Sequence, residues 1–454
     1  MSFLEKVYEH SPIFWQNLMT SVAGYQKNST RYGQVYHDYR AFLKDFDTWP
    51  LQKQQDYQFS ELMKLLNYAV KNSRFYRELY AGVDLASFKT VEDLKKLPIV
   101  DKEMLRKNIE DVITDKANTV EEHTGGTTGK SLVVRHRIED SMRRMATLDH
   151  FKSRVGFEHL QMKRATFNGK HIVPPGQKSK VFWRYNRACK QMIYSSFFLT
   201  EENIPYYLDS LNRFKPDALD GFFTCMLDLA NYMKRKGIQP GFQLKAIFPT
   251  SETLTPSGRA LLEEIFSCKV YDQYASSEGA PFVTDCPHQR LHMDLASGVF
   301  EHFGEGDEVL VTSFTTYATP LIRYRIGDSM VFSPEGQACP CGMQAPMVEE
   351  IRGRRLDFLY TPEGAKVNAG NVSNLLKNMP NSVIRAQFQQ SVMDKVTVLL
   401  EVDKALYNET YDDLLRSEFL HKFGPDLKVE IRHVDEIPRE GSGKFRMIKN
   451  DVEF

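Results

Sequence analysis

A glycine- and threonine-rich loop near residue 125 constrains this chain more than any other segment. It reads Thr124-Gly125-Gly126-Thr127-Thr128-Gly129-Lys130-Ser131. Glycines let backbone N–H groups approach phosphate oxygens, the hydroxyls add neutral donors, and the lysine supplies compensating charge. A Walker A loop would need glycine where Thr124 stands, which excludes that class of NTPase. The pattern therefore predicts a different phosphate-binding loop, although glycines and threonines also form ordinary turns.

Length and charge exclude several other classes of protein. A chain of 454 residues suits roughly two or three domains. Lysine plus arginine and aspartate plus glutamate both number 59, without a long block of one sign, so neither nucleic acid nor anionic lipid is an expected partner. The first 24 residues lack the apolar core of a signal peptide, and no apolar run reaches membrane-spanning length. We therefore expect a cytoplasmic protein without membrane insertion and without disulfides; an oligomer is compatible with the sequence.

Apolar periodicity indicates a helical start followed by alternating strands and helices. The first hundred residues are predicted to be mostly helical, and a helix over residues 59–73 presents one face formed by Leu62, Leu65, Leu66, Ala69 and Val70. Helical stretches such as 225–236 then separate strand-like runs at 132–136, 246–249, 270–274, 308–314 and 321–326. The last of these runs is expected to end at Gly327-Asp328. This alternation predicts an α/β core.

A second domain is predicted after residue 353. Strand candidates at 396–402 and 429–434 flank a helical stretch at 407–422, which is enough for a small α+β domain of about a hundred residues. We place the boundary so that residues 1–353 form the amino-terminal domain and residues 354–454 the carboxyl-terminal domain.

Six motifs follow one another along the chain. After the loop come Ser251-Glu252, Tyr274-Ala275-Ser276-Ser277-Glu278, Arg323-Tyr324-Arg325-Ile326-Gly327-Asp328, Gly353-Arg354 and Gly441-Ser442-Gly443-Lys444. In this order they resemble the adenylate-forming superfamily over essentially the whole chain. The likeness is closest to the phenylacetate-CoA ligase branch and its CapK-type capsular polysaccharide biosynthesis proteins. That branch is further indicated by Phe75-Tyr76-Arg77, Leu97-Pro98-Ile99, Lys102 and Phe182-Trp183-Arg184.

The resemblance implies both a fold and a reaction. The fold would have a large multi-layer domain that binds ATP and acid, followed by a small mobile lid. The enzyme would be an ATP-dependent, AMP-forming ligase: a carboxylate attacks the α-phosphate of ATP, giving an acyl-adenylate and pyrophosphate, and a second nucleophile, often coenzyme A, then displaces AMP. Such catalysis depends on positioning and on cations that offset charge in the transition state.

The resemblance also implies roles for residues that bind the phosphates. Lys130 and the loop hydroxyls would hold the β- and γ-phosphates, and Glu278 would bind Mg²⁺, because a hard cation prefers carboxylate oxygen. Three further residues are placed at the nucleotide: Ser251, Glu252 and Ser277. Without the resemblance, Glu278 would be interpreted as an ordinary exposed glutamate.

Three other residues would bind the nucleoside. Tyr274 would lie against the adenine, while Asp328 would accept hydrogen bonds from the ribose hydroxyls and Arg354 would reach the same sugar. The alternative interpretation of Gly327-Asp328 is a plain turn.

Lys444 is the predicted adenylation lysine. A mobile Gly-Ser-Gly arm could bring its ammonium to the reacting carboxylate and α-phosphate and withdraw it afterwards. Without the resemblance it would be interpreted as a solvated tail lysine. The chain departs from the family at Leu356, which stands where an acid usually acts at the hinge, so the hinge electrostatics and the second half-reaction are in question.

Closely spaced cysteines predict a structural zinc site. Cys339 and Cys341 form a tight pair, and Cys286 with a histidine can complete a Cys₃His set. Both His288 and His292 are near enough; the resemblance to zinc-bearing members of the branch favours His292, which follows a leucine. Free reduced cysteines are the alternative, because only the fold can join the two pairs.

Substrate recognition is the least constrained part of the sequence. An acid pocket could be lined by residues 168–171, by aromatic residues at 182–185 and 197–198, and by residues 221–223, although aromatic side chains are more often core. We expect a small carboxylic acid as substrate and coenzyme A, an amine or a sugar hydroxyl as acceptor. The CapK-like resemblance suggests a role near surface-polysaccharide assembly.

Two other classes of function remain to be weighed. The chain could be a catalytically inactive adenylate-binding scaffold in a polysaccharide-synthesis complex, but its joint possession of Lys130, Glu278, Asp328, Arg354 and Lys444 argues against this. A nucleic-acid-binding zinc ribbon would need a basic stripe beside the cysteines, whereas that segment ends in Glu349-Glu350.

Overall fold

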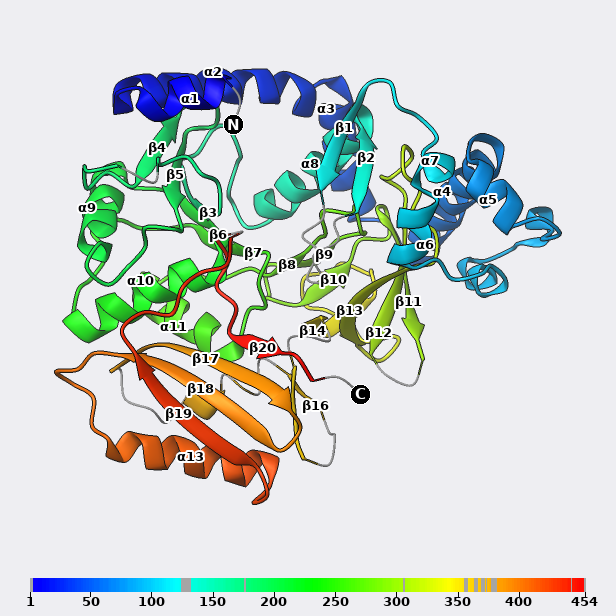
Figure 1. Ribbon diagram of the computed structural model, residues 1–454. Coiled ribbons are helices and arrows are strands. Elements are labelled where there is room, and N and C mark those ends of the chain that lie inside the picture. The colour runs from blue at the N-terminus through cyan, green and yellow to red at the C-terminus, as the bar shows by residue number, and fades with distance from the viewer. Residues whose placement is uncertain are drawn as a thin grey trace. The chain divides into compact units, whose positions relative to one another are not determined.

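The computed structural model describes residues 3–123, 132–174, 177–304, 307–354, 358–362, 366–368, 372, 374–376, 382–441 and 443–452 (Figure 1). The chain forms two compact units, each assembled from separate segments. Unit 1 comprises Met1–Gly24, Leu160–Val270 and Arg352–Phe454, and unit 2 comprises Tyr25–His159 and Tyr271–Ile351. The division into domains at residue 353 that the sequence predicts stays a prediction.

The first part of the chain is helical, as predicted. Its α-helices are α1 (Phe3–His10), α2 (Ile13–Arg31), α3 (Gln34–Phe46), α4 (Leu51–Asn72), α5 (Arg74–Leu79), α6 (Lys102–Lys107) and α7 (Ile109–Val112), with 3₁₀ turns at Leu85–Ser87 and Val91–Lys96. The predicted helix over 59–73 is confirmed as part of α4, which begins earlier. Its predicted face is buried at Leu62, Leu65, Leu66 and Ala69. No described helix is both long enough and apolar enough to cross a membrane.

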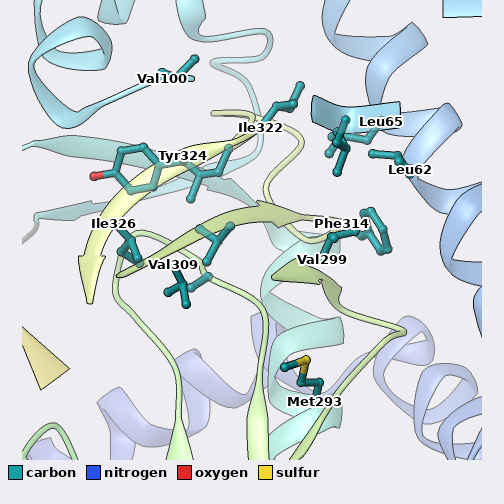
Figure 2. Packing of buried hydrophobic residues seen from close by; sticks show 14 of the residues in the cluster. Leu62, Leu65, Val100, Met293, Val299, Val309, Phe314, Ile322, Tyr324 and Ile326 are labelled. Atoms are coloured by element: carbon teal, nitrogen blue, oxygen red, sulfur yellow. The ribbon is translucent and has the colours of Figure 1, made fainter. Parts of the chain in front are cut away.

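Unit 2 contains a seven-stranded sheet of order β11-β12-β13-β14-β10-β9-β8. The strands are β8 (Gln273–Tyr274), β9 (Val283–Asp285), β10 (Leu291–Met293), β11 (Gly298–Phe303), β12 (Glu308–Ser313), β13 (Tyr324–Phe332) and β14 (Met347–Arg354). A separate antiparallel hairpin, β1 (Thr119–His123) and β2 (Val133–Arg137), precedes helix α8 (Ile138–Ser153). Figure 2 shows the core of this unit, where Leu62 and Leu65 of α4 belong to one cluster with Val299, Phe314 and Tyr324.

The predicted end of a strand at Gly327-Asp328 is wrong. Strand β13 continues through both residues to Phe332. Its pairing with β12 shifts between Leu310↔Arg325 and Glu308↔Ser329, so β13 contains extra residues there. Gly327 has a φ of +82° inside this irregularity. A β-bulge thus absorbs the residues that look like a turn in the sequence.

Unit 1 is built around a five-stranded sheet of order β4-β5-β3-β6-β7. Strands β3 (Arg164–Asn168), β5 (Gln191–Ser195), β6 (Ala218–Phe222) and β7 (Ala246–Thr250) are parallel, and β4 (Trp183–Asn186) is an antiparallel edge. The connecting helices are α9 (Ile204–Phe214), α10 (Phe223–Lys236) and α11 (Pro256–Phe266). The predicted strand at 246–249 and helix at 225–236 are confirmed. Because the strands are parallel, the loops after β3, β5, β6 and β7 share one edge.

The last hundred residues of unit 1 form a second, four-stranded sheet of order β19-β18-β17-β20. Its strands are β17 (Val383–Val392), β18 (Lys395–Val402), β19 (Lys428–Val434) and β20 (Ile448–Asn450), with a short pair β15 (Phe358–Tyr360) and β16 (Lys366–Asn368). Helix α13 (Thr410–Phe423) lies across one face (Figure 1) and contributes Leu415, Phe419 and Phe423 to a separate core with Phe388 and Val398. The predicted small α+β architecture is therefore present.

Candidate functional site

The predicted phosphate loop connects two antiparallel strands. Strands β1 and β2 pair from Thr119↔Arg137 to His123↔Val133, and residues 124–131 separate them in the sequence. A Walker A loop instead opens a helix, which agrees with its exclusion from the sequence. The loop itself, from Thr124 through Gly125, Gly126, Thr127, Thr128 and Gly129 to Lys130, lies outside the described residues, and its role stays a prediction.

Tyr274 and Asp328 meet in unit 2. The Tyr274 hydroxyl donates a hydrogen bond of 2.6 Å to Oδ2 of Asp328, and both side chains are buried. Tyr274 ends β8, and Asp328 lies in the bulge of β13. The alternative interpretation of Asp328 as part of a plain turn is therefore wrong, and the two residues predicted at the nucleoside are neighbours.

Glu278 is buried in the loop after β8, with 3% of its surface exposed, so its interpretation as an exposed glutamate is wrong. The Ser277 hydroxyl lies 3.3 Å from one Glu278 carboxylate oxygen. Gly279 has a φ of +106°, and a Cβ there would lie 2.4 Å from the Thr316 methyl carbon. Glycine is thus required immediately after Glu278, because the turn combines left-handed backbone with close packing.

Arg144 of α8 holds this turn, and the sequence interpretation missed it. Its Nη1 donates to the carbonyl oxygens of Gly279 and Ala280, each at 2.9 Å, and to Thr315 Oγ1 at 3.1 Å. Burial lowers the pKa of Arg144 to about 10. The sequence carries no clear signal for this role, because the partners of Arg144 lie more than a hundred residues away in the chain.

Ser251 and Glu252 follow β7 in unit 1. Ser251 is exposed and has a φ of +67°, a left-handed conformation that is uncommon for a residue with a side chain. Glu252 Oε2 accepts the Thr224 N–H at 2.8 Å, and Oε1 accepts the Thr224 hydroxyl at 3.0 Å. Thr224 lies at the start of α10, where backbone N–H groups lack helical partners and favour an anion. Burial raises the pKa of Glu252, and the bonds from Thr224 and Phe445 act in the opposite direction.

Glu252 also contacts the segment that carries Lys444. Its Oε1 accepts the backbone N–H of Phe445, the next residue, at 3.2 Å. The turn is closed by two backbone bonds, from Glu440 N–H to Lys444 O at 2.9 Å and from Gly443 N–H to Glu440 O at 2.8 Å. Lys444 is half-buried rather than fully solvated. The role of Glu252 at the nucleotide stays a prediction, since in this structure it binds the protein itself.

Gly443 packs against the same sheet edge. A Cβ at Gly443 would lie 2.5 Å from Ser196 Oγ and 2.6 Å from the Gly169 Cα, and its φ is +76°. Gly169 follows β3, Ser196 follows β5, and Glu252 follows β7. Loops after three parallel strands therefore meet the Lys444 turn, which is the edge where α/β sheets usually bind ligands.

Two residues with predicted roles are not fully described by the structure. Arg354 ends β14, but its side chain is not among the described ones. Leu356 lies outside the described residues. Their roles stay predictions.

The aromatic residues that could line an acid pocket divide into two groups. Phe182, Phe222 and Phe223 are buried in the core around the parallel sheet. Phe197 is half-buried, stacks on His171 with ring centroids 4.4 Å apart, and lies beside Gly443. Of the candidates, Gly169 and Phe197 thus lie next to Gly443, and His171 stacks on Phe197.

Unit 2 brings four potential metal ligands together. The ligand atoms of Cys286, His292, Cys339 and Cys341 all lie within 4.8 Å of one another. His292 Nδ1 is 3.1 Å from the Ala345 carbonyl, which leaves Nε2 for a metal. His288 is exposed and outside this group.

Two of the distances between these atoms match those around a tetrahedral zinc ion. Bonds of about 2.3 Å to sulfur and about 2.0–2.1 Å to nitrogen would separate two sulfurs by roughly 3.8 Å and a sulfur from a nitrogen by roughly 3.6 Å. The Cys286 and Cys339 sulfurs are 3.7 Å apart, and Cys341 Sγ lies 3.5 Å from His292 Nε2. Burial lowers the pKa of His292, which favours the neutral form that ligates metals.

Comparison with known proteins identifies the family. Protein CapK of Staphylococcus aureus is 37% identical to this chain over 457 residues, covering 99% of this chain and 100% of that protein. The chain belongs to the CapK family. The family model of the CapK C-terminal domain matches residues 359–451.

This CapK-family chain also resembles phenylacetate-CoA ligases, as predicted. The phenylacetate-coenzyme A ligase of Thermus thermophilus is 24% identical over 453 residues, covering 90% of this chain and 98% of that enzyme. Among solved structures, 2-hydroxyisobutyryl-CoA ligase in its postadenylation state, in complex with R3-HIB-AMP, matches with a TM-score of 0.71 at 18% identity. That match covers 89% of this chain and 91% of the ligase. The predicted adenylate-forming fold is confirmed.

Proposed function

We propose that this CapK-family protein activates a carboxylic acid with ATP and passes the acyl group to an acceptor. In the first half-reaction a carboxylate oxygen attacks the α-phosphorus, the bond to the bridging oxygen of pyrophosphate breaks, and acyl-AMP forms. In the second, a nucleophile such as the thiol of coenzyme A attacks the acyl carbon, and AMP leaves as the thiol proton is released. Phenylacetate-CoA ligases among the relatives support the thiol as acceptor.

The observation that carries this proposal is the support around Lys444. Its turn is closed by backbone bonds, and the following residue, Phe445, is bonded to Glu252 at the edge of the parallel sheet. A solvated tail lysine needs no such support. In the proposed reaction its ammonium offsets the charge that develops as two anionic groups approach, a role in which fixed position contributes much of the effect.

The nucleotide would be bound by unit 2. Asp328, already held by Tyr274, would accept hydrogen bonds from the ribose, and the 124–130 loop would bind the phosphates. Glu278 would hold Mg²⁺, which supplies charge neutralisation on the phosphates when bound. The buried Arg144 supports this assignment, since it fixes the backbone immediately after Glu278.

Zinc is proposed as a structural ion of unit 2. Four protein ligands would close its coordination shell and leave no position for substrate, so the ion would stabilise the fold rather than take part in the chemistry. The spacing of Cys286, His292, Cys339 and Cys341 supports this.

The acid and the biological setting are proposed only by class. The resemblance in the sequence suggests a role near surface-polysaccharide assembly, with coenzyme A, an amine or a sugar hydroxyl as acceptor. Phe197, which lies beside Gly443, and His171, which stacks on it, are the proposed acid-contacting pair.

The test is acid-dependent exchange of labelled pyrophosphate into ATP, with Mg²⁺, across aryl, aliphatic, hydroxy and amino acids. Exchange with one class would establish adenylation and identify the substrate together. If no acid of the panel supports exchange although calorimetry shows that ATP binds, the result would favour the inactive scaffold or an acid carried on a sugar.

A further inference from the structure

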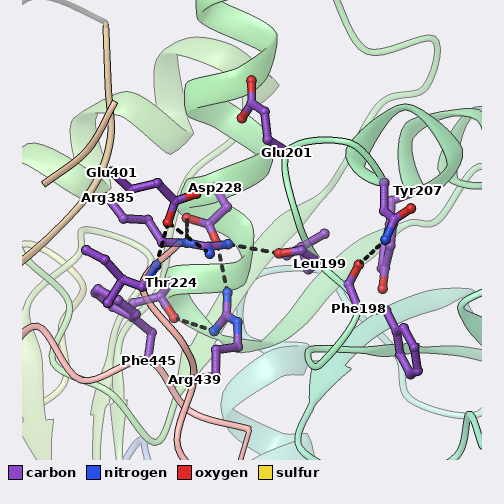
Figure 3. A network of polar contacts seen from close by, with 12 residues as sticks. Phe198, Leu199, Glu201, Tyr207, Thr224, Asp228, Arg385, Glu401, Arg439 and Phe445 are labelled. Atoms are coloured by element: carbon purple, nitrogen blue, oxygen red, sulfur yellow. Dashed lines mark hydrogen bonds and ion pairs between the residues drawn. The ribbon is translucent and has the colours of Figure 1, made fainter. Parts of the chain in front are cut away.

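Asp228 on α10 accepts hydrogen bonds from two arginines of the last hundred residues (Figure 3). Arg385 of β17 places Nε 3.3 and 3.2 Å from its two carboxylate oxygens and Nη2 2.7 Å from one of them. Arg439, five residues before Lys444, donates from Nη2 to Oδ2 at 2.7 Å. The three side chains are only 5–7% exposed. One buried carboxylate is thus shared by two guanidinium groups.

Other groups complete this network and balance its charge. Arg385 Nη2 donates to the Leu199 carbonyl at 2.8 Å, and its Nη1 lies 3.6 Å from the Glu401 carboxylate. Two carboxylates therefore offset two guanidinium groups, as buried charges require. Burial by itself would lower the pKa of Arg385, but Asp228 and then Glu401 outweigh it and the pKa is raised.

The network extends to the residue after Lys444. Thr224, one helical turn before Asp228, accepts from Arg439 Nη1 at 3.2 Å and donates its hydroxyl to Glu252 at 3.0 Å. Glu252 in turn accepts the Phe445 N–H. A continuous chain of hydrogen bonds therefore runs from Asp228 to Phe445. Residues 440–444 lie between its two points of attachment, Arg439 and Phe445.

We propose that Asp228 is a positioning residue that docks the Lys444 turn onto α10 through Arg439. The inference rests on the proposed role of Lys444 in adenylation. Holding the backbone on both sides of a five-residue turn limits the positions that the Lys444 ammonium can reach. Loss of the Arg439 attachment would leave the turn held at Phe445 on one side and only from Ile437, bonded to Glu401, on the other. A misplacement of about 1 Å can cost roughly a hundredfold in rate.

Hydrogen exchange and lysine labelling test the docking without any substrate. The variants are Arg439→Gln and Asp228→Asn, with Arg439→Lys as the conservative change. Because Asp228→Asn also removes the nearest carboxylate charge from Arg385, Arg439→Gln isolates the attachment of the turn. The control is Glu264→Gln. Glu264 lies on α11 and forms a 2.8 Å surface ion pair with Lys234, which lies on α10 as Asp228 does. Amide exchange is followed by mass spectrometry, and Lys444 is acetylated with sulfo-N-hydroxysuccinimidyl acetate.

We expect amide exchange in residues 437–448 to be at least tenfold faster in Arg439→Gln and Asp228→Asn, and acetylation of Lys444 at least threefold faster. Arg439→Lys should be intermediate, and Glu264→Gln should match the parent chain. Wild-type rates in Arg439→Gln would overturn the proposal. So would an increase spread evenly over the chain, since that indicates general destabilisation rather than release of the turn.

Activity supplies a second readout. With an acid that supports pyrophosphate exchange, Arg439→Gln should lower the exchange rate at least tenfold while its calorimetric affinity for ATP stays within twofold of the parent. Equal losses in both would overturn the positioning role. Failure of the parent chain to exchange with any acid would count against the proposed function, whereas labelling and hydrogen exchange would still decide whether Asp228 docks the turn.

Discussion

The Tyr274 hydroxyl donates a 2.6 Å hydrogen bond to the Asp328 carboxylate, which joins the last residue of β8 to the bulge of β13. The bond orients a buried anion before any nucleotide is bound, so the cost of ordering it falls on folding rather than on binding.

If Asp328 accepts hydrogen bonds from ribose hydroxyls, Asp328→Asn should weaken ATP binding about tenfold, corresponding to roughly 1.4 kcal/mol. Titration calorimetry with ATP, 2′-deoxy-ATP and 3′-deoxy-ATP checks this. The parent chain should discriminate against at least one deoxy analogue, and Asp328→Asn should lose that discrimination. Unchanged affinity and unchanged discrimination would remove Asp328 from the site.

Lys444→Ala should abolish acid-dependent pyrophosphate exchange, with a loss on the order of a hundredfold or more, because it removes a positioned cation from the reacting groups. ATP affinity should stay within about twofold, equivalent to roughly 0.4 kcal/mol. Lys428→Ala is the control, since Lys428 is an exposed lysine that pairs with Asp394 at 2.7 Å. Parallel losses of exchange and ATP binding would instead place Lys444 on the nucleotide.

Gly443→Ala should lower exchange strongly, because a Cβ would collide with Ser196 Oγ and Gly169 Cα and the φ of +76° disfavours a side chain. The turn can relieve the collision only by moving away from the sheet edge. Gly441→Ala is a matched control two residues earlier, where a Cβ would meet nothing within 4 Å. The measurement is the rate of pyrophosphate exchange of each variant relative to the parent chain. Equal rates for the two variants would contradict close packing of the turn.

Arg144→Met should destabilise unit 2 by about 3 kcal/mol, because it leaves two buried carbonyl groups and a threonine hydroxyl without this donor. Arg144→Lys should recover part of the loss. Urea unfolding measures the effect, and the Mg²⁺ dependence of exchange shows whether Glu278 has moved. The neighbouring Arg143→Met is the control on the same helix. Equal stability of Arg144→Met and the parent would show that the guanidinium does not hold the turn.

Metal analysis of the purified protein should find about one zinc per chain. The joint substitutions Cys339→Ser and Cys341→Ser should remove the ion and lower the midpoint of thermal unfolding, whereas Cys189→Ala, outside the cluster, should retain it. A metal-free protein with full thermal stability would rule out the zinc site.

Much of the architecture was predictable because it is encoded locally. Helix α4 follows from the apolar periodicity of its own segment, and strand β7 from a short apolar run. The end of strand β13 could not be predicted, because a glycine followed by an aspartate is usual in a turn. The sequence does not show that β12 pairs with β13 on both sides of a bulge.

Some residues of the candidate site could also be predicted from the sequence, and others could not. Glu278, Asp328 and Lys444 were named because their motifs resemble those of the adenylate-forming superfamily, and Cys286, Cys339 and Cys341 because closely spaced cysteines suit a metal. Arg144 and Asp228 were missed, since each acts on a segment more than a hundred residues away. An arginine or an aspartate on a helix usually reads as a solvated residue until its partners are known.

The sequence by itself determined the family, the chemistry of the motifs and the residues able to ligate a metal, because these depend on residue type and on spacing along the chain. Only the tertiary structure decided that Glu252 contacts the Lys444 segment, that Tyr274 holds Asp328, and that His292 rather than His288 joins the cysteines. Those relationships depend on distances between segments that are far apart in the chain, which are set when parallel strands align their carboxyl ends and when buried charges find partners.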